Sequence, residues 1–185
     1  MGAIASPKPV KLIVAMLSAR ADRLDAAADR LRRDCGPTDA ASEIMPFDFT
    51  HYYDEQMGAG LLRQFLAFER LISPAQLVAI KRTTNRIEAE FAADRSGADG
   101  PARPVNLDPG YVAESKLVLA STKDFAHRVY LADGIYAEVT LRYVRGRWVA
   151  ADHTFPDYAS GRYDDFLTRA RRILRSRAAL KEPPR

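Results

Sequence analysis

Residues 61–91, LLRQFLAFERLISPAQLVAIKRTTNRIEAEF, carry the clearest structural signals of the chain. The apolar and aromatic run 61–72 predicts a buried strand. Ser73, Pro74 and Gln76 then match a helix start, because they supply an N-cap, a proline at the first helical position and a capping-box glutamine. Apolar residues at helical spacing follow. The stretch therefore predicts a strand that leads directly into an amphipathic helix.

The segments on either side extend this pair into an alternating order. Residues 11–17 predict a strand, and apolar positions over 24–35 predict a helix that ends at Gly36-Pro37. Residues 43–49 and 104–107 are two further strand candidates. The order strand, helix, strand, strand, helix, strand is that of a ferredoxin-like, split βαβ core.

A turn and a hairpin are predicted after this core. Asp108-Pro109-Gly110 fits a type II turn, with Tyr111 beside it. A three-residue loop, Ala132 to Gly134, then keeps one face of a hairpin apolar. On that apolar face the predicted pairs are Leu131–Ile135, Val129–Ala137 and His127–Val139. On the polar face they are Tyr130–Tyr136 and Arg128–Glu138.

The C-terminal segment predicts a helix over 162–177 with one apolar stripe. The stripe consists of Tyr163, Phe166, Leu167, Ala170, Ile173 and Leu174. Two roles are open for it: docking on the sheet with its arginines solvated, or acting as a basic amphipathic helix for a membrane or nucleic acid.

Length and composition agree with one globular unit. The chain has 185 residues, of which 47% are hydrophobic and 28% charged, and a single cysteine, Cys35, that excludes an internal disulfide. No apolar run reaches membrane-spanning length, so a cytoplasmic protein without a membrane partner is expected. We expect one α+β domain over 1–178, with a ferredoxin-like core, a β-hairpin region and a C-terminal helix packed on the sheet. Residues 179–185 are predicted to be a disordered basic tail.

The net charge of +4 is concentrated at one end of the chain. Residues 160–185 contain eight basic and three acidic residues, a net charge of +5, which leaves −1 for residues 1–159. A nucleic-acid binder is expected to have a basic surface across its domain, so this distribution does not favour nucleic acid as a partner.

Five groups of residues resemble one protein family. They are Phe49-Thr50 with Tyr52-Tyr53 and Met57-Gly58; Thr84-Asn85 with Glu88; 106–111, NLDPGY; Lys123-Asp124, His127-Arg128 and Tyr130-Leu131 running into 134–141; and Asp157-Tyr158. In this order they resemble the DUF4416 family of bacterial and archaeal proteins, whose activity is not established. Gln56 and His153 depart from the family pattern, which tends to have Glu and Trp there. Some members are described as GTP-binding, but this chain has no P-loop sequence.

The leading functional hypothesis is a site for a small phosphorylated or otherwise anionic ligand, such as a nucleotide, built from residues 106–140. Arginine and lysine suit phosphate or carboxylate, and tyrosines suit a planar group. The ligand-binding candidates are Tyr53, Arg103, Tyr111, Lys123, Arg128, Tyr130, Tyr136 and Asp157. If chemistry follows binding, the acid/base candidates are His127, Glu138 and Asp108.

Simpler interpretations stand beside these. Arg128 and Glu138 also fit a structural cross-strand ion pair, and His127 fits a hydrogen-bonded core residue. The polar stripe Lys81, Asn85 and Glu88 is either a solvated helix face or the wall of a groove. An RNA- or protein-binding adaptor is the second functional hypothesis, and a metal-dependent hydrolase the third, although no metal-ligand spacing is present. The sequence identifies no cofactor and no oligomeric state.

Overall fold

The computed structural model describes residues 2–94 and 100–179 as a mixed α+β structure. Its nine strands form one antiparallel sheet with the order β2-β4-β1-β5-β6-β8-β7, while β3 pairs with β4 and β9 with β8. The strands are β1 (Val10–Ser18), β2 (Thr38–Ala41), β3 (Met45–Pro46), β4 (Leu62–Ile72), β5 (Asn106–Val112), β6 (Lys116–Ser121), β7 (Val129–Ala132), β8 (Ile135–Val144) and β9 (Arg147–Ala150).

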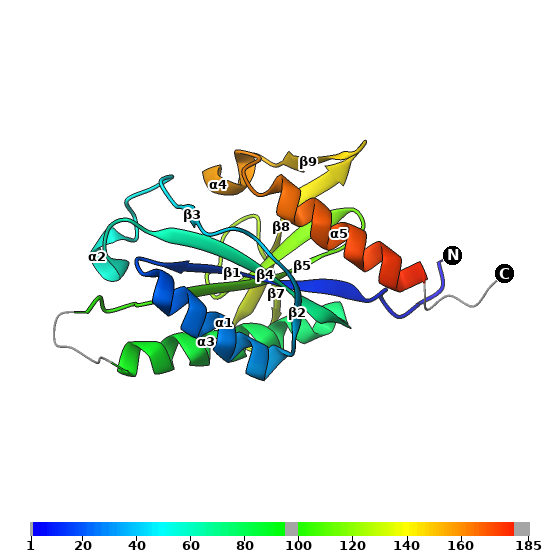
Figure 1. Ribbon diagram of the computed structural model, residues 1–185. Helices are drawn as coiled ribbons and strands as arrows, with labels where there is room; N and C mark the ends of the chain where they lie inside the picture. The colour runs from blue at the N-terminus through cyan, green and yellow to red at the C-terminus, as the bar shows by residue number, and fades with distance from the viewer. Residues whose placement is uncertain (1, 95–99, 180–185) are drawn as a thin grey trace.

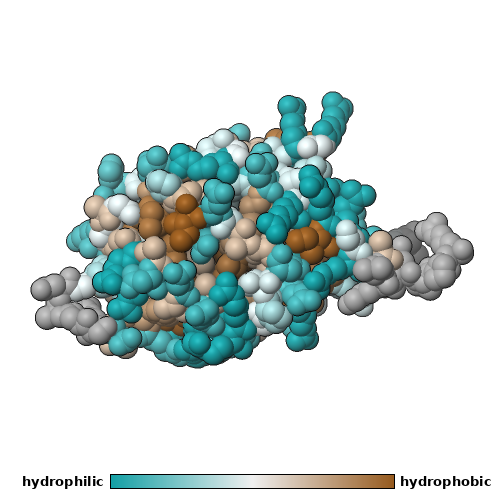
Figure 2. All heavy atoms as spheres, viewed as in Figure 1, coloured by the Kyte–Doolittle hydropathy of each residue, from teal (hydrophilic) through white to brown (hydrophobic). Residues whose placement is uncertain are grey.

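Helices cover both faces of the sheet (Figure 1). Helices α1 (Ala21–Cys35) and α3 (Leu77–Ala93) lie on one face, and α5 (Asp164–Ala179) lies on the other. The short helix α2 (Asp54–Met57) follows β3, the short helix α4 (Pro156–Ala159) follows β9, and the 3-10 turn η1 (Pro74–Gln76) leads into α3. Figure 2, in the same view as Figure 1, shows a surface largely covered by hydrophilic residues, with hydrophobic residues between them.

The elements with strong apolar patterns form where they were predicted. All nine residues of β1 are buried, and β4 reproduces the predicted strand almost residue for residue. The start of α3 follows the capping signal, since Gln76 Oε1 accepts a hydrogen bond from the Ser73 backbone N–H at 2.9 Å. In each case the burial of one face stabilises the conformation that the residues favour locally.

The strand predicted at 43–49 was wrong in extent. β2 begins earlier, directly after Pro37, and only Met45 and Pro46 form β3. Ser42 separates the two, because its hydroxyl accepts a hydrogen bond from the Phe65 N–H at 2.9 Å while its own N–H bonds to the Phe65 carbonyl. A serine side chain that binds the backbone in this way competes with regular strand pairing.

The turn predicted at Asp108-Pro109-Gly110 was also wrong, because these residues continue β5. Pro109 lies opposite Val14 of β1 and directly precedes Gly110, the first residue of β5 that pairs with β6. Proline is tolerated in a strand where no neighbour needs its missing N–H. Gly110 explains the rest of the signal, since it is the site of a close backbone approach between β5 and β6.

Gly110→Ala is expected to destabilise the protein by about 1–3 kcal/mol, because the added methyl group overpacks this contact. An ideal Cβ at Gly110 would clash with the Val118 carbonyl oxygen and lie 2.6 Å from Leu119 Cδ2. The free energy of unfolding in urea measures the loss. Gly100→Ala is the matched control, because no atom of the described residues lies within 4 Å of a Cβ there. A Gly110 variant as stable as this control would contradict the tight packing of β5 on β6.

The hairpin of β7 and β8 has part of the predicted register. Val129 lies opposite Ala137 and Tyr130 opposite Tyr136, as expected. The loop, however, has two residues, Asp133 and Gly134, both with positive φ (52° and 74°). Ala132 pairs with Ile135, so Leu131 is the extra residue of a bulge and not the partner of Ile135. The apolar face is therefore not continuous, and Val129 and Leu131 are exposed on the edge strand.

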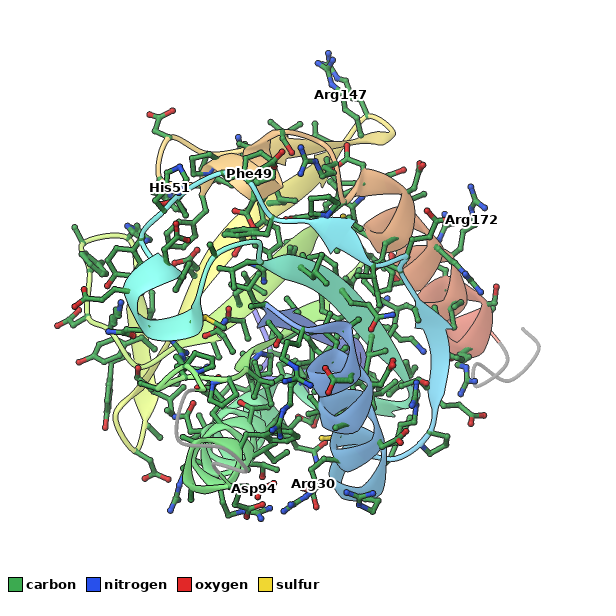
Figure 3. The ribbon with its side chains drawn as sticks, turned by 60° about the vertical axis from the view of Figure 1, so that its left-hand side comes forward. Arg30, Phe49, His51, Asp94, Arg147 and Arg172 are labelled. Atoms are coloured by element: carbon green, nitrogen blue, oxygen red, sulfur yellow. The ribbon has the colours of Figure 1, made fainter. Side chains whose placement is uncertain are left out.

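Helix α5 docks on the sheet, as the first of its two predicted roles required. Its buried residues include Phe166, Leu167 and Leu174, and the Phe166 ring lies 5.2 Å from that of Phe65 in β4. Arg172 points away from the sheet (Figure 3). The tail predicted at 179–185 falls almost entirely on residues 180–185, which lie outside the described residues.

Candidate functional site

A pocket of about 740 Å³ opens beside the sheet, between the β3–α2 segment, α3 and α4. Its walls come from the first residues of β4 and β5, the end of β6 and the middle of β8. Figure 3 shows the β3–α2 segment, with Phe49 and His51, passing close to α4. Segments from residue 47 to residue 158 thus meet around one space, which only the sheet order brings together.

Seven of the eleven site residues predicted from the sequence line this pocket. They are Tyr53, Arg103, Asp108, Lys123, Arg128, Glu138 and Asp157. The other four, His127, Tyr111, Tyr130 and Tyr136, do not line it. The polar stripe of α3 also lines the pocket, so its interpretation as the wall of a groove is the one that the structure supports.

The three tyrosines outside the pocket have other neighbours. Tyr111 is three residues beyond Asp108 on β5 and therefore faces the opposite side of the sheet, where it packs against the α3 side of the core. Tyr130 and Tyr136 form an edge-to-face pair, with ring centroids 5.3 Å apart, at the turn end of the hairpin. The sequence predicted their pairing but not their distance from the pocket.

Arg128 and Glu138 form a buried ion pair at one wall of the pocket. Arg128 Nε lies 2.8 Å from Glu138 Oε2, and the two side chains keep only 5% and 2% of their surface exposed. Arg128 Nη1 also donates to the Ser121 hydroxyl at 2.8 Å, and Thr140 Oγ1 donates to Glu138 Oε1 at 3.3 Å. Both ions are already paired and hydrogen-bonded within the chain. We therefore assign this pair a structural role in the wall of the pocket.

His127 does not lie opposite Val139, so that part of the predicted register was wrong. It sits in the turn before β7, where its Nε2 is 3.1 Å from Glu138 Oε2. Its ring stacks on that of His153, with centroids 4.4 Å apart, and on Phe125 at 6.0 Å. It therefore supports the Arg128–Glu138 pair from outside the pocket.

Two neighbouring carboxylates are held in different electrostatic environments. Burial disfavours the charged form of Asp108, but Lys81 and Arg63 outweigh it, so the pKa of Asp108 lies below its ordinary value. Burial raises the pKa of Glu88, although Lys81 and Arg103 oppose the rise. Lys81 Nζ lies 3.5 Å from Asp108 Oδ1, which makes it the closest positive charge to that group.

Hydrogen bonds hold both of these carboxylates in place. The Asn106 amide donates to Asp108 Oδ2 at 2.6 Å. Glu88 accepts the Leu107 backbone N–H at 2.6 Å and Arg103 Nη2 at 3.1 Å. The start of β5 is thereby tied to α3, and the two acids form one rigid wall.

Arg63 and Asp157 form a second buried pair, at the side of the pocket made by β4 and α4. Arg63 Nη2 lies 3.5 Å from Asp157 Oδ2, which also accepts the Tyr163 hydroxyl at 3.2 Å. Burial raises the pKa of Asp157, although Arg63 opposes the rise. Arg63 is not among the site residues predicted from the sequence. Its place two residues before the buried Phe65 was the available signal, since alternate residues of a strand share a face.

Aromatic side chains supply much of the remaining wall. Besides Tyr53, the rings are Phe47, Phe49, Tyr52, Phe125, Phe155 and Tyr158. Lys123 lies at this part of the pocket, with its Nζ 3.3 Å from the Tyr52 hydroxyl and 5.3 Å from the centre of the Tyr52 ring. Within residues 2–94 and 100–179, Lys123 makes no ion pair with a carboxylate.

The charged side chains of the pocket leave a small positive excess. Four are acidic: Glu88, Asp108, Glu138 and Asp157. Five are basic: Arg63, Lys81, Arg103, Lys123 and Arg128. Four of the basic side chains have a carboxylate partner, so Lys123 carries the excess charge.

The sequence of the chain was compared with models of protein families. Residues 8–174 match the family model described as "Domain of unknown function (DUF4416)". The chain belongs to the DUF4416 family. Each of the five residue groups that suggested DUF4416 from the sequence contributes at least one side chain to the pocket: Tyr53, Glu88, Asp108, Glu138 and Asp157 are examples.

Three further findings concern the DUF4416 chain. A comparison with curated proteins found no match. In the part of the chain that the structure describes, no group of three or more His, Cys, Asp or Glu side chains is arranged to hold a metal ion. No described helix combines the length and the apolar character that crossing a membrane requires.

Proposed function

We propose that this protein binds a small anionic molecule with a phosphate or carboxylate group and a planar ring, such as a nucleotide, in the pocket described above. One observation carries the proposal: six separate segments of the chain bring basic or aromatic side chains to a single concave site. A pocket of a few hundred Å³ with apolar walls and a few convergent polar groups is the usual form of a small-molecule site.

The residues divide the recognition of such a ligand between them. The rings of Tyr52, Tyr53 and Phe125 offer faces for stacking a planar group. Lys123, which has no carboxylate partner among the described residues, is free to meet a negative charge. The catalytic roles predicted for Asp108, Glu138 and His127 stay predictions. Lys81 and Arg63 lower the pKa of Asp108 and so favour its ionised form at neutral pH.

We also propose that β1, α1, β2, β4, α3 and β5 form a ferredoxin-like, split βαβ core. The sheet order β2-β4-β1-β5 and the place of both helices on one face support it. In this arrangement the pocket lies at one end of the core, where the later strands β6 and β8 extend the sheet.

A ligand screen tests the binding proposal. The melting temperature is measured with nucleoside mono-, di- and triphosphates, sugar phosphates and small dicarboxylates, and calorimetry gives the Kd of the strongest compound. Lys123→Ala is expected to weaken that compound about 3- to 10-fold, the value of one partly screened charge-assisted hydrogen bond.

Lys116→Ala is the matched control, because Lys116 is an exposed lysine at the other end of β6 and does not line the pocket. Its Kd is expected to equal that of the unaltered chain. The proposal fails if no compound shifts the melting temperature, or if Lys123→Ala binds as tightly as the control. Salt-dependent retention on RNA in the same protein would instead support the adaptor hypothesis.

A further inference from the structure

Arg63 is a buried cation with most of its hydrogen-bonding capacity unused. Its side chain keeps 5% of its surface exposed, and its only ion pair among the described residues is the 3.5 Å contact of Nη2 with Asp157. Nε and Nη1 are buried and have no hydrogen-bond partner in the described chain. A guanidinium carries five N–H donors, so most of them point at nothing that can accept.

This state differs from that of the other buried cations of the pocket. Arg128 donates to a carboxylate, a hydroxyl and a backbone carbonyl, and Lys81 donates to the Leu107 carbonyl at 3.1 Å. More than about 90% of buried polar groups in proteins have a partner, because an unmet donor costs its full desolvation. The exception at Arg63 therefore calls for an acceptor that the described residues do not supply.

The hydroxyl of Tyr158 is in the same condition at the same side of the pocket. It is buried, and none of the described residues accepts or donates a hydrogen bond to it. Burial raises the pKa of Tyr158 well above its ordinary value although Arg63 opposes the rise, so the hydroxyl keeps its proton and is a donor. Both Arg63 and Tyr158 line the pocket, one from β4 and the other from α4.

The groups around Arg63 contact its side chain but accept no hydrogen bond from Nε or Nη1. Arg63 Cζ lies over the Phe47 ring, 4.8 Å from its centre, and over the Phe65 ring, 5.9 Å from its centre. Asp157 is itself held by the Tyr163 hydroxyl. The oxygens of carboxylates and phosphates bind a guanidinium in its plane, where the N–H bonds point.

We infer that Arg63 and Tyr158 form a subsite for an oxyanion of the ligand, a phosphate or a carboxylate group. The inference rests on the proposed function, since it assigns one chemical group of the same ligand to one end of the same pocket. Oxyanion oxygens supply the acceptors that Arg63 and Tyr158 lack, and Asp157 keeps the guanidinium in position. Lys123 then meets a different part of the ligand, nearer to solvent.

Titration of the purified chain with sodium phosphate and with sodium malonate, at constant ionic strength, tests the subsite. The two probes distinguish a phosphate from a carboxylate. Tyr158→Phe removes only the unpartnered hydroxyl, so the variant is expected to melt no lower than the unaltered chain but to bind the preferred anion about 2- to 10-fold more weakly. Arg63→Met combined with Asp157→Asn removes both charges, and is expected to weaken binding about 10- to 100-fold.

Tyr111→Phe is the matched control, because Tyr111 does not line the pocket and faces the opposite side of the sheet from Asp108. This variant is expected to bind the anion as tightly as the unaltered chain. The inference is overturned if the unaltered chain binds neither anion, or if Tyr158→Phe and the double variant bind as tightly as the unaltered chain. A screen ligand that still depends on Lys123 in that case would leave the proposed function standing without the subsite.

Discussion

Deleting residues 162–185 is expected to abolish cooperative folding of the chain. The deletion removes α5, whose Phe166, Leu167 and Leu174 are buried on the sheet. Each of these side chains contributes about 1.5–3 kcal/mol by burial, so together they rival the whole stability of a domain of this size. The loss would also expose Phe65, which packs against the Tyr163 ring at 4.6 Å.

Circular dichroism during urea unfolding measures this result, and a fragment of residues 1–161 should show no cooperative transition. Deleting only residues 179–185 is the control, because Leu174 is the last buried side chain of the described helix. That variant should unfold like the full chain. A 1–161 fragment with a sharp transition and unaltered stability would contradict the docking of α5.

Glu138→Ala is expected to cost about 3–5 kcal/mol of unfolding free energy, the next largest effect. The substitution leaves the Arg128 guanidinium, which is almost fully buried, without its carboxylate partner. It also removes the acceptor of His127 and of Thr140. An unpaired buried charge costs more than the pair itself contributes, because the remaining ion keeps the full desolvation cost.

Two further variants make the measurement specific to burial of the pair. Glu69→Ala removes an exposed carboxylate that pairs with Arg177 at 3.2 Å, and should cost less than about 1 kcal/mol. Glu138→Leu together with Arg128→Met should regain much of the loss, since no unpaired charge remains. A Glu138→Ala variant that is no less stable than Glu69→Ala would show that the pair is solvated in solution.

The sequence by itself was enough for the elements that bury one continuous face. β1, β4, α1, α3 and α5 follow from apolar periodicity and from end signals such as Gly36-Pro37. The family was evident as well, because its residue groups are local in the chain. Such signals depend on neighbouring residues, so no knowledge of distant contacts is needed to recognise them.

Strand pairing determined the backbone conformation where the local residue preferences predicted a different one. Pro109-Gly110 has the composition of a turn, but β1 on one side and β6 on the other hold it in an extended strand. The bulge at Leu131 likewise depends on how β7 meets β8. Turn propensities amount to a few tenths of a kcal/mol to about 1 kcal/mol, which a ladder of hydrogen bonds on a central strand exceeds.

For the candidate site, the sequence determined which chemical groups were available, and the tertiary structure decided which of them meet. Asp108, Lys123 and Glu138 were recognisable as polar groups within a family motif, and all three reach the pocket. Arg63 and Tyr158 matter for a reason that no local pattern contains: their donors are buried and unmet. Whether a donor has an acceptor depends on residues far away in the chain, since a hydrogen bond forms only within about 3 Å, and only the folded sheet sets those distances.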